Sequence, residues 1–179
     1  MKINYLFPDT ILIEQVNEQD FKAIGEEIEY NFEIINRLLN CGTWNDKIHT
    51  TYEKCICIIT ELNLNKLKSI LNPLIYNYAK TLNIKSINSE NITLKRSWIS
   101  IATPGGFQDL HVHNHNVISG CIYLNILPDS GNIEFQPPTY QLYKGASVYK
   151  PKNGMILIFH GLMPHRTFYN RSNKNRISL

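Results

Sequence analysis

Residues 108–119 read QDLHVHNHNVIS, and this stretch sets the expectation for the rest of the chain. His111, His113 and His115 are separated by single residues, and alternate residues of a β-strand leave the same face of the sheet. We therefore expect a strand that presents three imidazoles in one direction. Imidazole is the commonest metal ligand in proteins, which makes the stretch a candidate metal site. The alternatives are a polar strand that faces solvent and a histidine that is satisfied by hydrogen bonds.

The C-terminal half has the pattern of a β-domain. After Asn91, short runs of β-branched and aromatic residues alternate with turn signals such as Pro-Gly-Gly, Pro-Asp-Ser-Gly and Pro-Lys-Asn-Gly. The runs are ITLKRSWISIA, HVHNHN, SGCIYLNIL, GNIEFQ, SVYK, GMILIFHG and RISL. Many short strands with regular turns are typical of sandwiches, jelly rolls and barrels.

The N-terminal half has a helical pattern instead. Apolar residues recur at three- and four-residue steps over residues 21–39, which predicts one long amphipathic helix with Asn17 as its N-cap and Gly42 just beyond its end. A second stripe covers residues 64–82, where Pro73 predicts either a kink or the first turn of the helix.

The segments around these helices are less regular. ILIEQV, residues 11–16, follows a turn signal and predicts an outlying strand. Residues 41–54 are expected to form a loop in which Trp44 either anchors the loop or covers an opening. Cys55 and Cys57 are expected to be small buried apolar residues, because the chain has no CxxC pair or zinc-finger spacing.

Composition limits the class of protein. The chain has 179 residues, 43% of them hydrophobic, which suits one domain, with residues 1–90 as mostly helical support and residues 91–179 as the β core. The net charge of +3 is small, so nucleic acid is an unlikely partner. The chain shows neither a signal-peptide pattern nor a run of membrane-spanning length, and we expect a cytoplasmic protein without a membrane partner.

Three features of the β half together suit a non-haem iron site. His111 and His113 lie close together, His165 follows a strongly apolar run, and Arg176 stands eleven residues further on in the last short run. A mononuclear iron site needs two neighbouring ligands, one distant ligand and open positions for substrate and oxygen. An arginine can hold the carboxylate of a cosubstrate in a bidentate pair and does not lose its proton.

From Trp98 to the C-terminus the chain resembles the Fe(II)/2-oxoglutarate-dependent dioxygenases, in particular the prolyl-4-hydroxylase-like branch and its bacterial and phage relatives. The matching passages are HVHNHNVISGCIYLN, GNIEFQPP and PKNGMILIFHGLMPHRTF followed by NRISL. The resemblance implies an α+β protein with a double-stranded β-helix, or jelly roll, and N-terminal helices packed against its larger sheet. A phage-encoded member would act in the cytoplasm of the host.

The resemblance also implies a ligand set. His111 and His165 match the iron-binding histidines, Arg176 matches the residue that pairs with the distal carboxylate of 2-oxoglutarate, and Tyr123 matches a tyrosine that hydrogen-bonds the same cosubstrate. His113 stands where most of the superfamily has Asp or Glu. The implied cofactors are Fe(II) and 2-oxoglutarate, with O2 as cosubstrate and ascorbate as a reductant, and the implied reaction is hydroxylation of a peptidyl or amino-acid C–H bond.

A histidine in place of the carboxylate has chemical consequences. Three neutral imidazoles leave the metal with its full charge, which favours chelation by an anionic cosubstrate. Protons compete with a metal for imidazole below pH about 6.5, the ordinary value, so we expect the metal affinity to fall at mildly acidic pH.

Other polar residues near these motifs have alternative roles. His115 is expected to be a bystander, and His160 a structural residue or a neighbour of the site. Asp109 would replace His113 only if the strand register slipped. Arg171 is a competitor of Arg176 for the cosubstrate, Arg166 is expected on the opposite face from His165, and Trp98 is expected in the core or in the cavity wall.

Two other functions stay open at this point. One is a cupin-like protein that binds a metal through three histidines without using 2-oxoglutarate. The other is a binding domain that has the same fold and no activity. The substrate, whether peptidyl or a small molecule, and the oligomeric state are not determined by the sequence.

Overall fold

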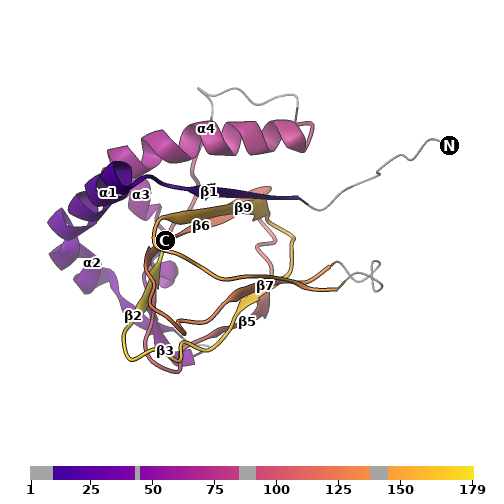
Figure 1. Ribbon diagram of the computed structural model, residues 1–179. Coiled ribbons are helices and arrows are strands. Elements are labelled where there is room, and N and C mark those ends of the chain that lie inside the picture. The colour runs from indigo at the N-terminus through magenta and orange to yellow at the C-terminus, as the bar shows by residue number, and fades with distance from the viewer. Residues whose placement is uncertain (1–9, 43–44, 85–91, 138–144) are drawn as a thin grey trace.

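The computed structural model describes residues 10–42, 45–84, 92–137 and 145–179, with only the backbone of Cys41 and Gly42. The chain forms helices in its first half and strands mainly in its second, as the sequence predicts (Figure 1). The helices are α1 (Glu18–Tyr30), α2 (Phe32–Leu38), α3 (Ile58–Glu61) and α4 (Asn65–Thr81), with a 3₁₀ turn, η1, at Tyr52–Lys54. The strands are β1 (Ile11–Gln15), β2 (Asn40–Gly42), β3 (Asn45–Thr50), β4 (Ser100–Ala102), β5 (Gln108–His111), β6 (Ile118–Asn125), β7 (Ile133–Phe135), β8 (Ser147–Tyr149), β9 (Met155–His160), β10 (His165–Thr167) and β11 (Arg176–Ser178).

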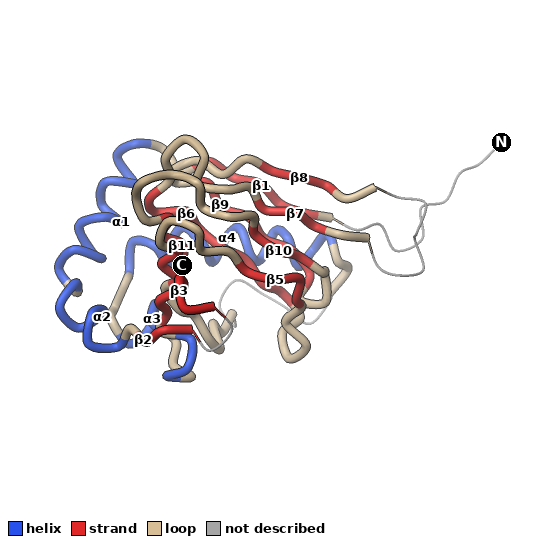
Figure 2. The backbone as a smooth tube through the Cα atoms, turned by 90° about the horizontal axis from the view of Figure 1, so that it is seen from below, coloured by secondary structure: helices blue, strands red, loops and turns tan. Residues whose placement is uncertain are grey.

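The strands form two antiparallel sheets. The larger sheet has the order β1-β9-β6-β11-β4-β3-β2, and the smaller sheet has the order β5-β10-β7-β8. From β4 onward the chain passes repeatedly from one sheet to the other, and only β7 and β8 are consecutive neighbours within a sheet. Figure 2 shows β5, β7, β8 and β10 side by side as one layer. The expected α+β class with many short antiparallel strands is therefore confirmed.

Two apolar cores hold these layers together. Ile24 of α1 and Leu67 of α4 are fully buried against the outer face of the larger sheet, where β9 contributes Ile156 and Ile158. A second cluster lies on the inner face and contains Tyr123, Ile133, Phe135, Met155, Leu157, Phe159 and Met163. α4 lies over β1, β9 and β6 in Figure 1, and α1 and α4 share the apolar core with β6 and β9. The expected packing of helices on the larger sheet is therefore confirmed.

The single long helix predicted for residues 21–39 is wrong, because the chain breaks at Asn31. Asn17 does cap α1, and its side chain accepts a hydrogen bond from the Asp20 amide at 2.9 Å. At the other end, the Asn31 side chain is buried and donates to the carbonyls of Glu27 and Leu62. A polar side chain that bonds nearby backbone competes with helix continuation, and α2 starts afresh with Ile35 bonded to the Asn31 carbonyl.

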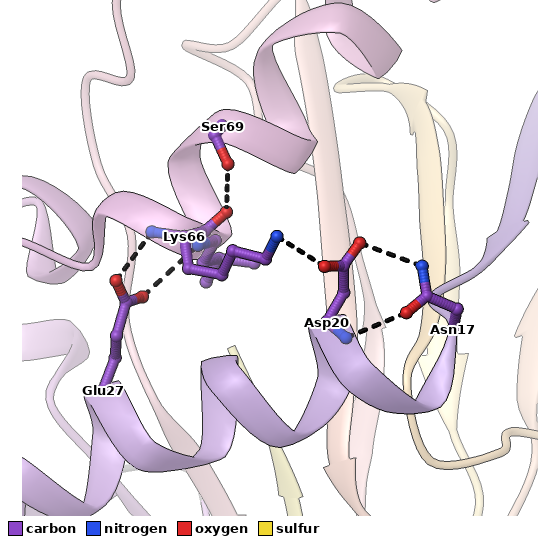
Figure 3. Close-up of polar contacts among 6 residues, drawn as sticks. Asn17, Asp20, Glu27, Lys66 and Ser69 are labelled. Carbon is purple, nitrogen blue, oxygen red and sulfur yellow. Dashed lines mark hydrogen bonds and ion pairs between the residues drawn. The ribbon is translucent and has the colours of Figure 1, made fainter.

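The helix α4 begins against α1 through polar contacts that Figure 3 shows. Its N-cap residue is Leu64, whose side chain makes no capping bond. The Glu27 carboxylate of α1 instead accepts from the amides of Lys66 at 2.6 Å and Leu67 at 3.3 Å, and the Lys66 ammonium pairs with Asp20. Pro73 lies inside α4 rather than in its first turn.

Residues 41–54 are not the loop that the sequence predicts, because most of them pair as strands. β2 pairs with β3, and β3 pairs with β4 in the register Ile48–Ala102 and Thr50–Ser100. Ile48 and Thr50 are buried, and His49 between them is partly exposed. The sequence NDKIHT contains one apolar residue, so its composition gave no sign of this strand pattern. Trp44 lies outside the described residues.

Two further expectations concern segments near this sheet. The strand predicted for ILIEQV is confirmed as β1, which pairs with β9. The expected burial of the cysteine pair is wrong, because Cys55 is exposed and Cys57 is only partly buried. Within the described residues, each helix is too short or too polar to cross a bilayer.

Candidate metal centre

Three histidines from separate parts of the β half converge between the two sheets. His165 of β10 lies directly opposite His111 of β5 in the antiparallel register, and their ring centroids are 4.2 Å apart. His113 completes the group at 5.0 Å from His165 and 5.3 Å from His111. One ring nitrogen of each residue lies within 4.8 Å of the others, a spacing that suits ligands of a single ion.

The strand that was expected to carry His111, His113 and His115 is shorter than predicted. β5 ends at His111, and residues 112–117 turn away from the strand. The turn is fixed by long-range bonds, since the His113 amide donates to the Gly161 carbonyl at 2.7 Å and the Gly161 amide donates to the Val117 carbonyl at 3.0 Å. A side chain at Gly161 would collide with the Asn116 carbonyl. His113 therefore reaches the site from a turn, and His115 does not share a strand face with it.

Each of the three imidazoles uses its Nδ1 atom for a bond directed away from the group. His111 Nδ1 lies 2.7 Å from the Asp109 carbonyl and His165 Nδ1 lies 2.9 Å from the Met163 carbonyl. A carbonyl accepts only, so these two nitrogens carry the proton and the Nε2 atoms keep their lone pairs. His113 Nδ1 lies 2.9 Å from Ser119 Oγ. Outward bonds of this kind are typical of histidines that bind metal.

Burial keeps two of the imidazoles neutral. His165 is only 5% exposed, and burial together with the neighbouring His111 lowers the pKa of His165 to about 3. Burial, and then His111, lowers the pKa of His113 to about 4. Both groups are therefore unprotonated near neutral pH, as a metal ligand must be.

Arg176 lies on the other side of the same small cavity, which has a volume of about 60 Å³ and is also lined by Tyr123 and Thr167. Arg176 is 4% exposed. Its Nη1 donates to the carbonyls of Ser130 and Phe168, and its Nη2 donates to Thr167 Oγ1 at 2.9 Å.

The charge of Arg176 has no counterpart in the described part of the chain. Its hydrogen-bond acceptors are all neutral, and it forms no ion pair with a described carboxylate. Burial lowers the pKa of Arg176, but a guanidinium does not deprotonate near neutral pH. A buried charge without a partner is costly, and an anionic ligand in this cavity would supply the missing charge.

Sequence comparison identifies the β half. Residues 96–179 match the model of a family described as "Putative 2OG-Fe(II) oxygenase". The matched segment covers 84 of the 179 residues, somewhat under half of the chain. The match begins two residues before Trp98, where the resemblance seen in the sequence begins, and it includes all three histidines and Arg176. No protein of curated function matches the chain in sequence.

Solved structures extend the likeness in fold to nearly all of this chain. A Pseudomonas putida prolyl-4-hydroxylase shares 14% identity over 95% of this chain and 90% of its own, with a TM-score of 0.59. A Trichoplax adhaerens prolyl hydroxylase, solved with a hypoxia inducible factor peptide, shares 13% over 94% and 81%, with a TM-score of 0.66. The α-ketoglutarate-dependent epimerase SnoN from nogalamycin biosynthesis shares 11% over 95% and 75%, with a TM-score of 0.66.

The other candidates named from the sequence lie apart from the triad. His115 is exposed in the turn, Asp109 is exposed, and Arg171 is exposed before β11. His160 ends β9, and its Nδ1 accepts from the Leu162 amide at 3.1 Å. Arg166 points away from His165 and pairs with Glu134 at 2.8 Å.

Several residues near the candidate site were missed by sequence reasoning. Ser119 contacts His113, Thr167 contacts Arg176, and Cys121 shares a hydrogen bond with Tyr123. Ser119 and Cys121 could have been found from the sequence, because they alternate with Tyr123 along β6 and therefore share its inner face. Trp98 was expected in the core or the cavity wall, and it packs edge-on against His113 with ring centroids 5.5 Å apart.

Proposed function

We propose that the chain is an Fe(II)- and 2-oxoglutarate-dependent dioxygenase that hydroxylates a C–H bond of an organic substrate. The observation that carries the proposal is the pairing of two features in one cavity. One ring nitrogen from each of three imidazoles lies within 4.8 Å of the others, and a buried guanidinium without a described carboxylate partner lines the same cavity.

His111, His113 and His165 would hold the metal. When bound, Fe(II) and 2-oxoglutarate together supply O2 activation coupled to oxidative decarboxylation of the cosubstrate. The donor set fits a divalent ion that prefers imidazole. Because the three ligands are neutral, an anionic chelator is attracted by the full charge of the ion, which compensates for the absence of a carboxylate at position 113.

Arg176 and Tyr123 would hold the distal carboxylate of 2-oxoglutarate. Thr167 and two carbonyls orient the guanidinium, and the Nε–H and one Nη2–H of Arg176 remain for a bidentate pair. Burial raises the pKa of Tyr123 well above its ordinary value. The phenol therefore stays protonated and can donate a hydrogen bond to the carboxylate.

Aromatic rings pack around the site and limit the access of water to the reacting groups. Phe135 and Phe159 lie 5.8 Å and 4.8 Å from the His165 ring, and Trp98 covers His113. A dry, low-dielectric site strengthens each electrostatic contact within it.

We also propose that the two sheets form a double-stranded β-helix and that the chain is one domain. The alternation of β4–β11 between the sheets and the fold of the similar oxygenases support the first point. The core that α1 and α4 share with β6 and β9 supports the second. Ascorbate is proposed as the reductant that keeps the metal in the ferrous state.

Succinate formation from 2-oxoglutarate, with Fe(II) and ascorbate added, tests the proposal. We expect turnover in the unmodified chain, none in His165→Ala, and unchanged turnover in the control His49→Ala, which alters a histidine of β3. Anaerobic binding of N-oxalylglycine covers the case of slow turnover without substrate. A three-histidine protein of another class would bind Co(II) but not N-oxalylglycine, and an inactive binding domain would form no succinate with any substrate.

A further inference from the structure

A second and larger cavity, about 570 Å³ in volume, lies on the outer side of the larger sheet. Its walls are α4, the segment 92–98, and the strands β6 and β9. Leu71 and Ile75 of α4 face Ile118 and Ile122 of β6 across it. Sites for small ligands commonly have volumes of about 300–1,000 Å³, so the cavity is large enough for a substrate.

This cavity adjoins the metal centre. Trp98, His113, Gly120 and Cys121 line both cavities. On the side of β11, β6 pairs with β11 at Tyr123 and Asn125, and Ile122 bonds to the backbone of Leu179. The first residues of β6 therefore have no described strand partner on that side, where Trp98 and Leu179 also line both cavities.

The walls are mainly aliphatic. The partly exposed apolar side chains come from three directions, and they include Leu71 and Ile75 of α4, Ile92 and Leu94 of the segment 92–98, and Ile118 of β6. Such a surface binds a hydrocarbon body, and each methylene removed from water contributes a similar increment of binding.

The charged side chains of the lining are confined to one wall and have one sign. Lys95 and Arg96 line the cavity, and no described residue in its lining is acidic. Lys95 is exposed. The Arg96 guanidinium stacks on Tyr52 at 4.0 Å and donates from Nη2 to the Tyr52 carbonyl, but its buried Nε has no hydrogen-bond partner. This wall is suited to an anionic group.

We propose that this cavity is the substrate site and that it takes an anionic molecule with an aliphatic body, such as a medium-chain fatty acid. The carboxylate pairs with Lys95 and Arg96, the hydrocarbon lies between α4 and β6, and Trp98 determines which carbon reaches the metal. The inference rests on the proposed function. It replaces the peptidyl C–H bond that the sequence resemblance favours, because a cavity walled by isoleucines offers few partners for a peptide backbone.

Calorimetric titration of the metal-free protein with hexanoate, octanoate and decanoate tests the apolar part. We expect one site per chain and an affinity that rises about fourfold for each added methylene. Ile75→Phe and Leu71→Phe, which narrow the cavity from α4, should weaken decanoate binding at least tenfold. Co(II) binding in each variant shows whether it has folded. Folded variants that bind decanoate as tightly as the unmodified chain would overturn the inference.

A matched pair of charge reversals tests the anionic part. Lys95→Glu should weaken decanoate binding about fivefold. Lys68→Glu makes the same change on an exposed residue of α4 outside the lining and should have no effect. Decanol should bind to the unmodified chain more weakly than decanoate does. Its own affinity should be the same for the unmodified chain and for Lys95→Glu, because decanol carries no charge. Equal effects of the two reversals would show that the cavity does not select an anion.

The two proposals fail in different ways. If N-oxalylglycine binds to the Co(II)-loaded chain and decanoate does not bind, the proposed function stands and the substrate inference is wrong. If decanoate binds and N-oxalylglycine does not, the cavity is a lipid site and the dioxygenase proposal is wrong. A proline-containing peptide that stimulates succinate formation where decanoate does not would assign the site to peptides and overturn the inference.

Discussion

Ser119 Oγ lies 2.9 Å from His113 Nδ1 and holds the imidazole that converges with His111 and His165. Ser119 is 9% exposed, so few other groups can replace this contact. When the serine oxygen accepts the Nδ1 proton, His113 presents the Nε2 lone pair to the metal. In that tautomer the bond holds His113 in the form that can act as a ligand.

The first prediction concerns this bond. Ser119→Ala should lower the affinity for Co(II) by about 10- to 100-fold, the usual effect of removing a group that orients a ligand. Ser119→Thr keeps the hydroxyl and should restore most of the affinity. Anaerobic titration followed by the visible spectrum of Co(II) measures both. A threonine variant as weak as the alanine variant would show that packing, rather than the hydrogen bond, matters at this position.

A second prediction separates His113 from His115. His113→Ala removes one of three converging nitrogens and should weaken Co(II) binding at least 100-fold, whereas His115→Ala, an exposed residue of the same turn, should leave it unchanged. The same titration checks both variants. Loss of affinity in His115→Ala would mean that the turn rearranges when metal binds.

A third prediction follows from the unpaired charge of Arg176. Arg176→Met removes the guanidinium and should weaken binding of N-oxalylglycine by at least 100-fold, because a buried charge pair is lost. Arg171→Met, at an exposed position, is the control. The rise in melting temperature caused by N-oxalylglycine provides a second measure, and it should disappear only in Arg176→Met. An undiminished rise in that variant would place the cosubstrate elsewhere.

The sequence predicts the elements of this protein better than their lengths. Apolar periodicity locates α1, α4 and the strands of the β half, because those patterns follow from local geometry. The break at Asn31 and the end of β5 at His111 depend on contacts with Leu62 and Gly161, which are distant in sequence. His113 was thus assigned to the site for a partly wrong reason. Ser119 could be placed on the inner face of β6, but its contact with His113 requires the turn between them.

A fourth prediction concerns acid. Burial lowers the pKa of His113 to about 4 and that of His165 to about 3, below the ordinary value of 6.5. Above pH 6.5 both residues are neutral in the folded and the unfolded chain. As the pH falls from 6.5 toward 3, the unfolded chain takes up protons that the folded, metal-free chain does not, so the free energy of unfolding decreases.

Urea unfolding of the metal-free protein at pH 7.5, 5.5 and 4.5 checks this prediction. The midpoint should fall with pH in the unmodified chain and fall less in His165→Phe, which does not titrate and has aromatic neighbours. The pH at which protons displace the metal from His113 and His165 should also be lower than the sequence suggests, because protons compete for these two ligands only well below pH 6.5. An equal fall in both proteins would assign the acid sensitivity to other groups.

The last prediction concerns the start of α4, the helix that forms one wall of the larger cavity. Leu64 at the N-cap provides no acceptor, and Glu27 of α1 accepts from the amides of Lys66 and Leu67 in its place. Glu27→Ala should therefore reduce the free energy of unfolding by about 1 kcal/mol, the usual effect of losing a cap. Glu27→Gln keeps an acceptor and should lose less of the free energy of unfolding.

Glu26→Ala is the control, because it removes only an exposed pair with Lys22 and should change stability by less than about 0.5 kcal/mol. Chemical denaturation measures all three, and similar losses in Glu27→Ala and Glu26→Ala would show that α4 does not depend on α1 for its cap.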